Sequence, residues 1–196
     1  MNSVKFDLVY PQEMSRGKLL LKTFFGWLYI GIPHGIILSV LGFIAGIMSF
    51  FAWWAVLFTG KYPKGMFDFI LNTTRWTMRV SAYLGLMTDV NPPYSFESPD
   101  SPVKLDIEYP ESLSRGKLLL RTFFGWLYVG VPHGIILSAL GALAEAIILI
   151  CWFIILFTGK FPEGMFKLVV GYFRWTLRVG AYSGFMTDEY PPFSFD

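Results

Sequence analysis

The second half of the chain repeats the first, and this repeat limits the possible folds more than any other feature. Residues 105–196 align with residues 6–97 at a constant offset of 99 positions without a gap, and 53 of the 92 aligned pairs are identical. Such a repeat predicts two copies of one structural unit. The polar, proline-bearing stretch Glu97–Pro102 is the predicted linker. We therefore place the first unit at residues 1–97 and the second at 98–196.

Each unit contains a long apolar run. His34 is the only Asp, Glu, Lys, Arg or His in the run Thr23–Phe58, and the run Thr122–Phe157 contains only His133 and Glu145. Only 15% of the whole chain is charged, against about 25% in a typical soluble domain. Apolar runs of this length are candidates for membrane-spanning segments. We therefore expect an integral membrane protein.

Several classes of partner and activity are not indicated. The net charge is only +2, and the sequence has no basic tract, so we expect no nucleic-acid partner. Cys151 is the only cysteine, so no internal disulfide can form. Asp7 and Glu13 precede the first apolar run, which is too long for a signal peptide. No nucleophile or metal-hydrolase motif is present, so we expect a non-enzymatic protein without a cofactor.

Each unit begins with a predicted strand and a helix start. Val4, Phe6 and Leu8 alternate with residues that are mostly polar, and the second unit repeats this alternation at 103–108. Such alternation favours a half-buried strand. The two strands could pair with each other or with the extended segments that end each unit. Ser15 and Ser114 are the expected N-caps of the helices that follow.

The segment Gly31–Gly35 interrupts the first apolar run. Pro33 predicts a kink or break, and it could also be the first residue of a new helix. We favour a helical hairpin or re-entrant wedge here. The alternatives are a short arm that turns at Pro33, or a single crossing by residues 33–58, which at ~1.5 Å per residue could span the bilayer.

A third helix in each unit carries a basic stripe on an otherwise apolar and aromatic surface, which is typical of a helix at the membrane interface. Basic residues at this helix and at the helix start are therefore predicted to contact lipid headgroups. They are Arg16, Lys18, Arg75 and Arg79 in the first unit and Arg115, Lys117, Arg174 and Arg178 in the second. The alternative for Arg75 and Arg79 is that they extend toward water or pair with Asp89.

Basic residues flank the apolar run on both sides in each unit, so the positive-inside rule places both flanks in the cytoplasm. An even number of crossings would also give both nearly identical units the same orientation. The halves would then be parallel repeats about an axis along the membrane normal.

Three polar residues are predicted inside the membrane: His34, His133 and Glu145. Such residues are functional candidates by default. Each histidine could satisfy backbone groups that the neighbouring proline leaves free, or lie at the headgroup level. The two histidines could instead bind a haem between them or handle protons. Glu145 replaces Gly46 of the first unit, and it could pair with a histidine, face a crevice or water, or contact a partner.

The motifs resemble a bacterial membrane-protein family known only as a domain of unknown function. In the first unit the shared pattern is Tyr10-Pro11, Ser15-Arg16, Leu57–Pro63, Arg75-Trp76 and Asp89–Tyr94, and the second unit repeats it. The first unit departs from the pattern at Asn91 and Tyr94. The resemblance covers nearly the whole chain and implies a bacterial membrane protein, but it implies no activity and no catalytic residue.

The expected fold is an all-α membrane protein with minor β, built from two tandem pseudo-symmetric repeats. Each repeat would hold a short strand, a proline-broken hairpin or spanning helix, and an interfacial amphipathic helix. The leading hypothesis is a scaffold or accessory subunit in the bacterial inner membrane, with both repeat ends cytoplasmic. Its partners would be lipids and other membrane subunits or itself. The alternative is a lipid-binding or lipid-transport protein with a crevice between the repeats.

Overall fold

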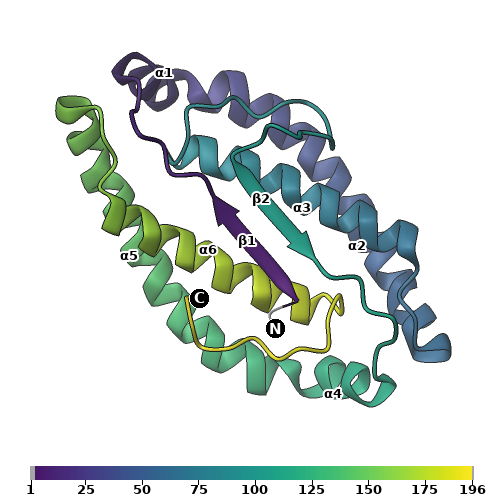
Figure 1. Cartoon of the computed structure of the whole chain (residues 1–196). Helices are drawn as coiled ribbons and strands as arrows, with labels where there is room; N and C mark the ends of the chain where they lie inside the picture. The colour runs from purple at the N-terminus through teal and green to yellow at the C-terminus, as the bar shows by residue number, and fades with distance from the viewer. Residues whose placement is uncertain (1–2, 196) are drawn as a thin grey trace.

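The computed structural model describes residues 3–195 and is mostly helical, with one small sheet (Figure 1). The first unit contains β1 (Val4–Leu8), α1 (Arg16–Gly26), the π-helical turn η1 (Trp27–Gly31), α2 (Ile32–Thr59) and α3 (Lys64–Leu84). The second contains β2 (Val103–Ile107), α4 (Arg115–Gly125), η2 (Trp126–Gly130), α5 (Val131–Thr158) and α6 (Glu163–Ser183). The predicted fold class is confirmed, although the outermost unit boundaries, Met1 and Asp196, lie outside the described residues.

The apolar run of each unit forms one continuous helix. The elements α1, η1 and α2 join into 44 residues from Arg16 to Thr59, and α4, η2 and α5 do the same in the second unit. The hairpin and the complete break expected at Pro33 are therefore wrong, whereas the alternative that Pro33 opens a new helical segment agrees with α2, whose first turn contains it. The π-helical turn just before the proline is the reason, because its wider hydrogen-bond ring accommodates the interruption without ending the helix. The amide of Ile32 accordingly bonds the carbonyl of Trp27, five residues back.

The ends of each long helix follow their local sequence. The Ser15 and Ser114 side chains accept hydrogen bonds from the backbone amides three residues later, so both predicted N-caps are confirmed. Gly60 and Gly159 end the helices in the left-handed conformation, with φ near +73° and +72°. Glycine is the residue that adopts this conformation without steric strain.

The two strands pair with each other as an antiparallel ribbon, which was one of the two predicted pairings. Phe6 lies opposite Leu105, and these residues are also equivalent in the repeat. A local two-fold axis therefore passes between them and relates the two units. Val4, Phe6 and Leu8 are buried while Lys5 and Asp7 are exposed, as the alternation predicts.

The units interlock across the ribbon. β1 packs on α6 of the second unit, and β2 packs on α3 of the first. The Phe6 ring contacts the edge of the Phe173 ring, with centroids 6.2 Å apart. The Tyr10 hydroxyl donates to the Phe161 carbonyl across the units, and Tyr109 makes the equivalent bond. Neither unit therefore has a complete core of its own.

The long helices run along the two outer flanks of the molecule in opposite directions, while the ribbon lies in front of α3 and α6 (Figure 1). Only 6% of the most apolar window of the first long helix is buried in the protein. The exposed side is lined by Phe24, Phe25, Trp27, Leu28, Ile36, Val40, Phe43, Ile47, Phe50, Phe51, Trp54 and Phe58. We call these residues and their equivalents the apolar outer face. A face of this size indicates that the chain associates with a membrane.

Candidate functional site

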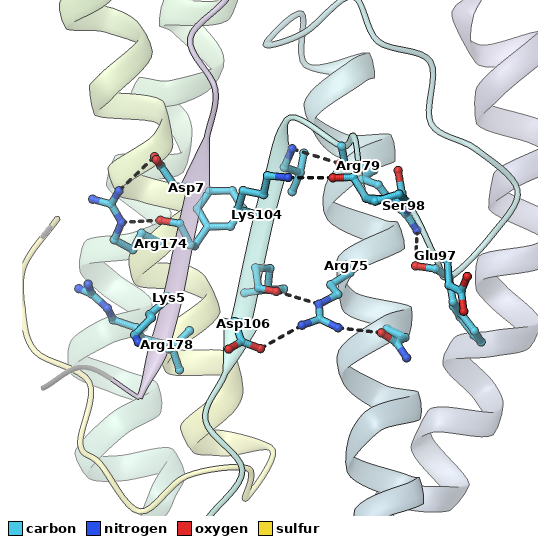
Figure 2. A pocket seen from close by; sticks show the side chains of 18 residues that line it. Lys5, Asp7, Arg75, Arg79, Glu97, Ser98, Lys104, Asp106, Arg174 and Arg178 are labelled. Atoms are coloured by element: carbon cyan, nitrogen blue, oxygen red, sulfur yellow. Dashed lines mark hydrogen bonds and ion pairs between the residues drawn. The ribbon is translucent and has the colours of Figure 1, made fainter.

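A cavity of about 930 Å³ lies at the ribbon and is the candidate binding site (Figure 2). We call it the ribbon-face groove. Its basic side chains come from the strands, α3 and α6, and they are Lys5, Arg75, Arg79, Lys104, Arg174 and Arg178. Its carboxylates are Asp7, Glu97 and Asp106. The interlocked fold therefore brings basic residues of both units to one place.

Arg75 and Arg174 attach the ribbon to the helices. The Arg75 Nε donates to the Leu105 carbonyl at 2.8 Å, and its Nη2 lies 3.0 Å from Asp106. Arg174 donates equivalently to the Phe6 carbonyl at 2.9 Å. These contacts occupy backbone carbonyls along the outer edges of the ribbon, so both arginines have a structural role. Contact of either with lipid headgroups stays a prediction.

Arg79 and Arg178 lie deeper, and each is only 5% exposed. The Arg79 Nη2 donates to the Ser95 carbonyl at 2.5 Å, and the Arg178 Nη1 donates to the Ser194 carbonyl at 3.3 Å. Burial, and to a lesser extent the nearby Arg75, lowers the pKa of the Arg79 guanidinium. These two arginines therefore hold the segments that follow α3 and α6 while lining the groove.

Of the four basic residues at the starts of α1 and α4, Arg16 and Arg115 connect the units, while Lys18 and Lys117 bond within their own unit. Arg16 donates to the Phe157 carbonyl at 3.0 Å, and Arg115 donates to the Phe58 carbonyl at 2.9 Å. Both carbonyls end a long helix of the other unit, where a cation is favoured by the helix dipole. Lys18 and Lys117 reach the carbonyls of Asp89 and Asp188 respectively. All four remain exposed, and their contact with lipid headgroups stays a prediction.

A buried ion pair in each unit was missed by the sequence analysis. Lys22, only 5% exposed, lies 2.6 Å from Asp89, and in the second unit Arg121 pairs with Asp188. The second Asp89 oxygen accepts the Ser15 amide at 2.6 Å, so the pair also fixes the start of α1. Asp89 therefore pairs with Lys22, and the predicted alternative partners Arg75 and Arg79 do not pair with it. The signal was available, since both units carry a cation and a carboxylate at these equivalent positions.

The second-unit histidine belongs to a complete hydrogen-bond chain. The Trp175 Nε1–H donates to His133 Nδ1 at 2.9 Å, so the neutral imidazole carries its proton on Nε2. That nitrogen lies 3.1 Å from the Tyr190 hydroxyl, which donates in turn to the Tyr128 carbonyl. Tyr128 is four residues before Pro132, which has no N–H to offer it. Tyr190 therefore satisfies both the histidine and the carbonyl.

The first unit lacks the last part of this chain. Trp76 donates to His34 Nδ1 at 2.9 Å, as in the second unit. Asn91 replaces the tyrosine, however, and His34 Nε2 is buried without a hydrogen-bond partner among residues 3–195. The imidazole stacks on Tyr94 with ring centroids 4.0 Å apart. The two units thus share a fold here but differ in how well a buried donor is satisfied.

Exchanging these two residues should change stability in opposite directions. We expect Tyr190→Asn to lower the free energy of unfolding by about 1–3 kcal/mol, because it leaves a buried donor unsatisfied. Asn91→Tyr should raise it by about 1 kcal/mol by supplying the missing hydroxyl. Chemical denaturation in one mild detergent would measure both. Destabilisation by both substitutions would contradict this account of the first unit.

The three predicted intramembrane residues do not form one site. His34 and His133 are fully buried, each against an aromatic set of its own unit, so they share no haem-binding pocket. Glu145 is exposed on α5, and no hydrogen bond or ion pair within residues 3–195 involves it. None of the three lines the ribbon-face groove. Within the same residues, no group of three or more His, Cys, Asp or Glu side chains is placed to hold a metal ion.

Comparison with known proteins agrees with the two-unit organisation. No curated protein and no solved structure matches the chain. A family model, described as a domain of unknown function (DUF4389), matches residues 21–95 and again residues 118–194. The two matches fall in the two repeat units and together cover most of the sequence. The chain therefore belongs to this family and contains two tandem copies of its domain.

Proposed function

We propose that the protein is a non-enzymatic scaffold or accessory subunit that lies in one leaflet of the bacterial inner membrane. Its two long helices run along the membrane plane, and the ribbon faces the cytoplasm. In this position the apolar outer face contacts lipid, while the ribbon-face groove is open to partners. The position of the charged ribbon at the middle of the long helices is the observation that carries the proposal.

The length of the helices supports an in-plane placement. α2 and α5 alone have 28 residues each, or ~42 Å at ~1.5 Å per residue. Crossing a ~30 Å hydrocarbon core with such a helix requires a tilt of about 45°, just beyond the usual range of 0–40°. The exposed apolar side chains continue from Phe24 to Phe58, so most of the helix needs lipid contact.

The charges at the ribbon support the same placement. The long helices are antiparallel, and the two-fold axis that relates them passes through the ribbon. If the helices crossed the bilayer, this axis would lie near the midplane. Lys5, Asp7, Lys104 and Asp106, all exposed, would then face hydrocarbon at several kcal/mol each. In the in-plane arrangement the axis follows the membrane normal, both units have one orientation, and these charges face water.

Labelling of introduced cysteines would test the placement. Glu13→Cys and Lys61→Cys lie just before and just after the first long helix and are exposed. In a Cys151→Ala background, a membrane-impermeant maleimide should label both from the cytoplasmic side only. Ile36→Cys, at a 63% exposed position of the apolar outer face, should resist labelling from either side. Labelling of the first two from opposite sides would show that the helix crosses the membrane.

Purification in a mild detergent would test the role as an accessory subunit. Stoichiometric co-elution with a larger membrane complex would support it. Elution alone or as a homo-oligomer would contradict that role and leave autonomous shaping of the bilayer. The lipid-transport alternative requires a lipid-sized crevice between the repeats near His34, His133 and Glu145, and none of these residues lines the ribbon-face groove.

A further inference from the structure

We propose that the ribbon-face groove binds a phosphate group, with Arg79 at its base and Lys5 and Lys104 at its rim. The phosphate could belong to a soluble compound or to a lipid headgroup, since the recognition chemistry is the same. The inference deepens the proposed scaffold function by naming a ligand class for the groove. It does not depend on how the protein lies in the membrane, because binding can be measured in detergent.

The charges that line the groove do not balance. Asp106 lies against Arg75 and Asp7 lies near Arg174, at 3.0 and 3.7 Å. Glu97 is then the only other carboxylate of the lining, and three further cations line the groove with it: Lys5, Arg79 and Lys104. The groove therefore has a surplus of positive charge, which comes from the strands and α3.

Arg79 is the most buried of these cations, and it has no anionic partner among residues 3–195. It is 5% exposed, and its described acceptors are the backbone carbonyls of Ser95 and Phe96. No carboxylate forms an ion pair with it in the described part of the chain, and its Nε has no hydrogen-bond partner there. Carbonyls orient a guanidinium but carry no net charge to neutralise it. A buried cation without a counter-ion is costly, so a bound anion would stabilise the groove.

The surrounding side chains favour phosphate as that anion. Figure 2 shows the Lys104 side chain extending from β2 toward Arg79 and the segment that carries Glu97 and Ser98, with Arg174 and Arg178 at the other strand. A phosphate monoester carries about −1.5 to −2 charges, which matches the surplus better than one carboxylate does. Arginine forks fit its oxygens, and the volume of about 930 Å³ lies within the range of small-molecule sites.

Thermal unfolding in a neutral detergent would test the proposal with two probes. Inorganic pyrophosphate represents a soluble source, and short-chain phosphatidic acid, which carries a phosphate monoester, represents a lipid source. At least one should raise the melting temperature in a saturable way, because a ligand of the native state stabilises it. Stabilisation by pyrophosphate identifies a soluble ligand, and stabilisation by the lipid alone identifies a headgroup. No stabilisation by either probe would overturn the proposal.

Matched variants show whether the groove is responsible. Lys5→Gln with Lys104→Gln removes two exposed rim charges and should weaken binding about tenfold. Lys61→Gln with Lys160→Gln removes the same charge at exposed positions outside the groove and should leave binding unchanged. Arg79→Gln should abolish binding. If the Arg79→Gln protein does not fold, the Lys5→Gln with Lys104→Gln variant decides the outcome. Equal weakening by the rim and control pairs would mean nonspecific attraction and would overturn the site, whatever cysteine labelling shows about membrane placement.

Discussion

Replacing Asp188 by alanine should lower the free energy of unfolding by about 3–5 kcal/mol, since it leaves a buried cation unpaired. The Arg121 side chain is only 2% exposed, and it donates to Asp188 and to the carbonyls of Tyr182 and Thr187. Asp188 also accepts the Ser114 amide at 2.6 Å. The substitution therefore loosens the start of α4 as well as the ion pair. Chemical denaturation of the whole protein in mild detergent would measure the loss.

Asp7→Ala is the matched control for that experiment. Asp7 also pairs with an arginine, Arg174, but at 3.7 Å and with its side chain 74% exposed. An exposed pair of this kind contributes at most about 1 kcal/mol. Asp89→Ala should resemble Asp188→Ala, because Lys22 is buried in the equivalent position. Similar losses for Asp7→Ala and Asp188→Ala would show that burial of the second pair has no special importance.

Phe6→Ala should have a comparable effect, a loss of about 3–5 kcal/mol, by leaving a cavity in the shared core. Phe6 is 4% exposed, lies beside the two-fold axis and contacts Phe173 of the other unit. The lost volume therefore weakens the contact between units and not only one strand. Denaturation in detergent, monitored by tryptophan fluorescence, would measure the change.

Lys5→Ala provides the comparison for Phe6→Ala, because it truncates the neighbouring residue on the exposed side of the same strand. Surface substitutions of this kind usually change stability by less than about 0.5 kcal/mol. If the two variants were equally stable, the buried face of the ribbon would not contribute to the joining of the units.

Local patterns in the sequence predicted those elements whose causes are local. The alternation at Val4–Leu8 reflects a strand with one buried face, and Ser15 caps a helix through atoms three residues away. The repeat predicted the two-unit organisation because it states directly that the same local structure occurs twice. Proline was misleading, since its effect at Pro33 depends on whether the preceding turn can widen, and residue type alone does not reveal that.

The site was less predictable because its contacts join distant residues. Lys22 lies on the polar side of an amphipathic pattern, which suggests exposure. It is buried nonetheless, in an ion pair with Asp89, which lies 67 positions later in the chain. The basic stripe of α3 has the periodicity of a helix that faces lipid headgroups. The stripe includes Arg75, which donates a hydrogen bond to the Leu105 carbonyl in β2 of the other unit. Periodicity shows that one face of a helix differs from the other, but it does not show what covers that face.

The pairing of Phe6 with Leu105 has a consequence for how the chain arose. Because each strand pairs with its own repeat equivalent, two copies of a single unit could form the same ribbon as a symmetric homodimer. The present chain is then a fused dimer in which the linker Glu97–Pro102 supplies a high effective concentration. In a homodimer every substitution appears twice, whereas fusion lets one half change alone. Glu145 and Asn91, which stand where the other half has Gly46 and Tyr190, are the kind of divergence that fusion permits.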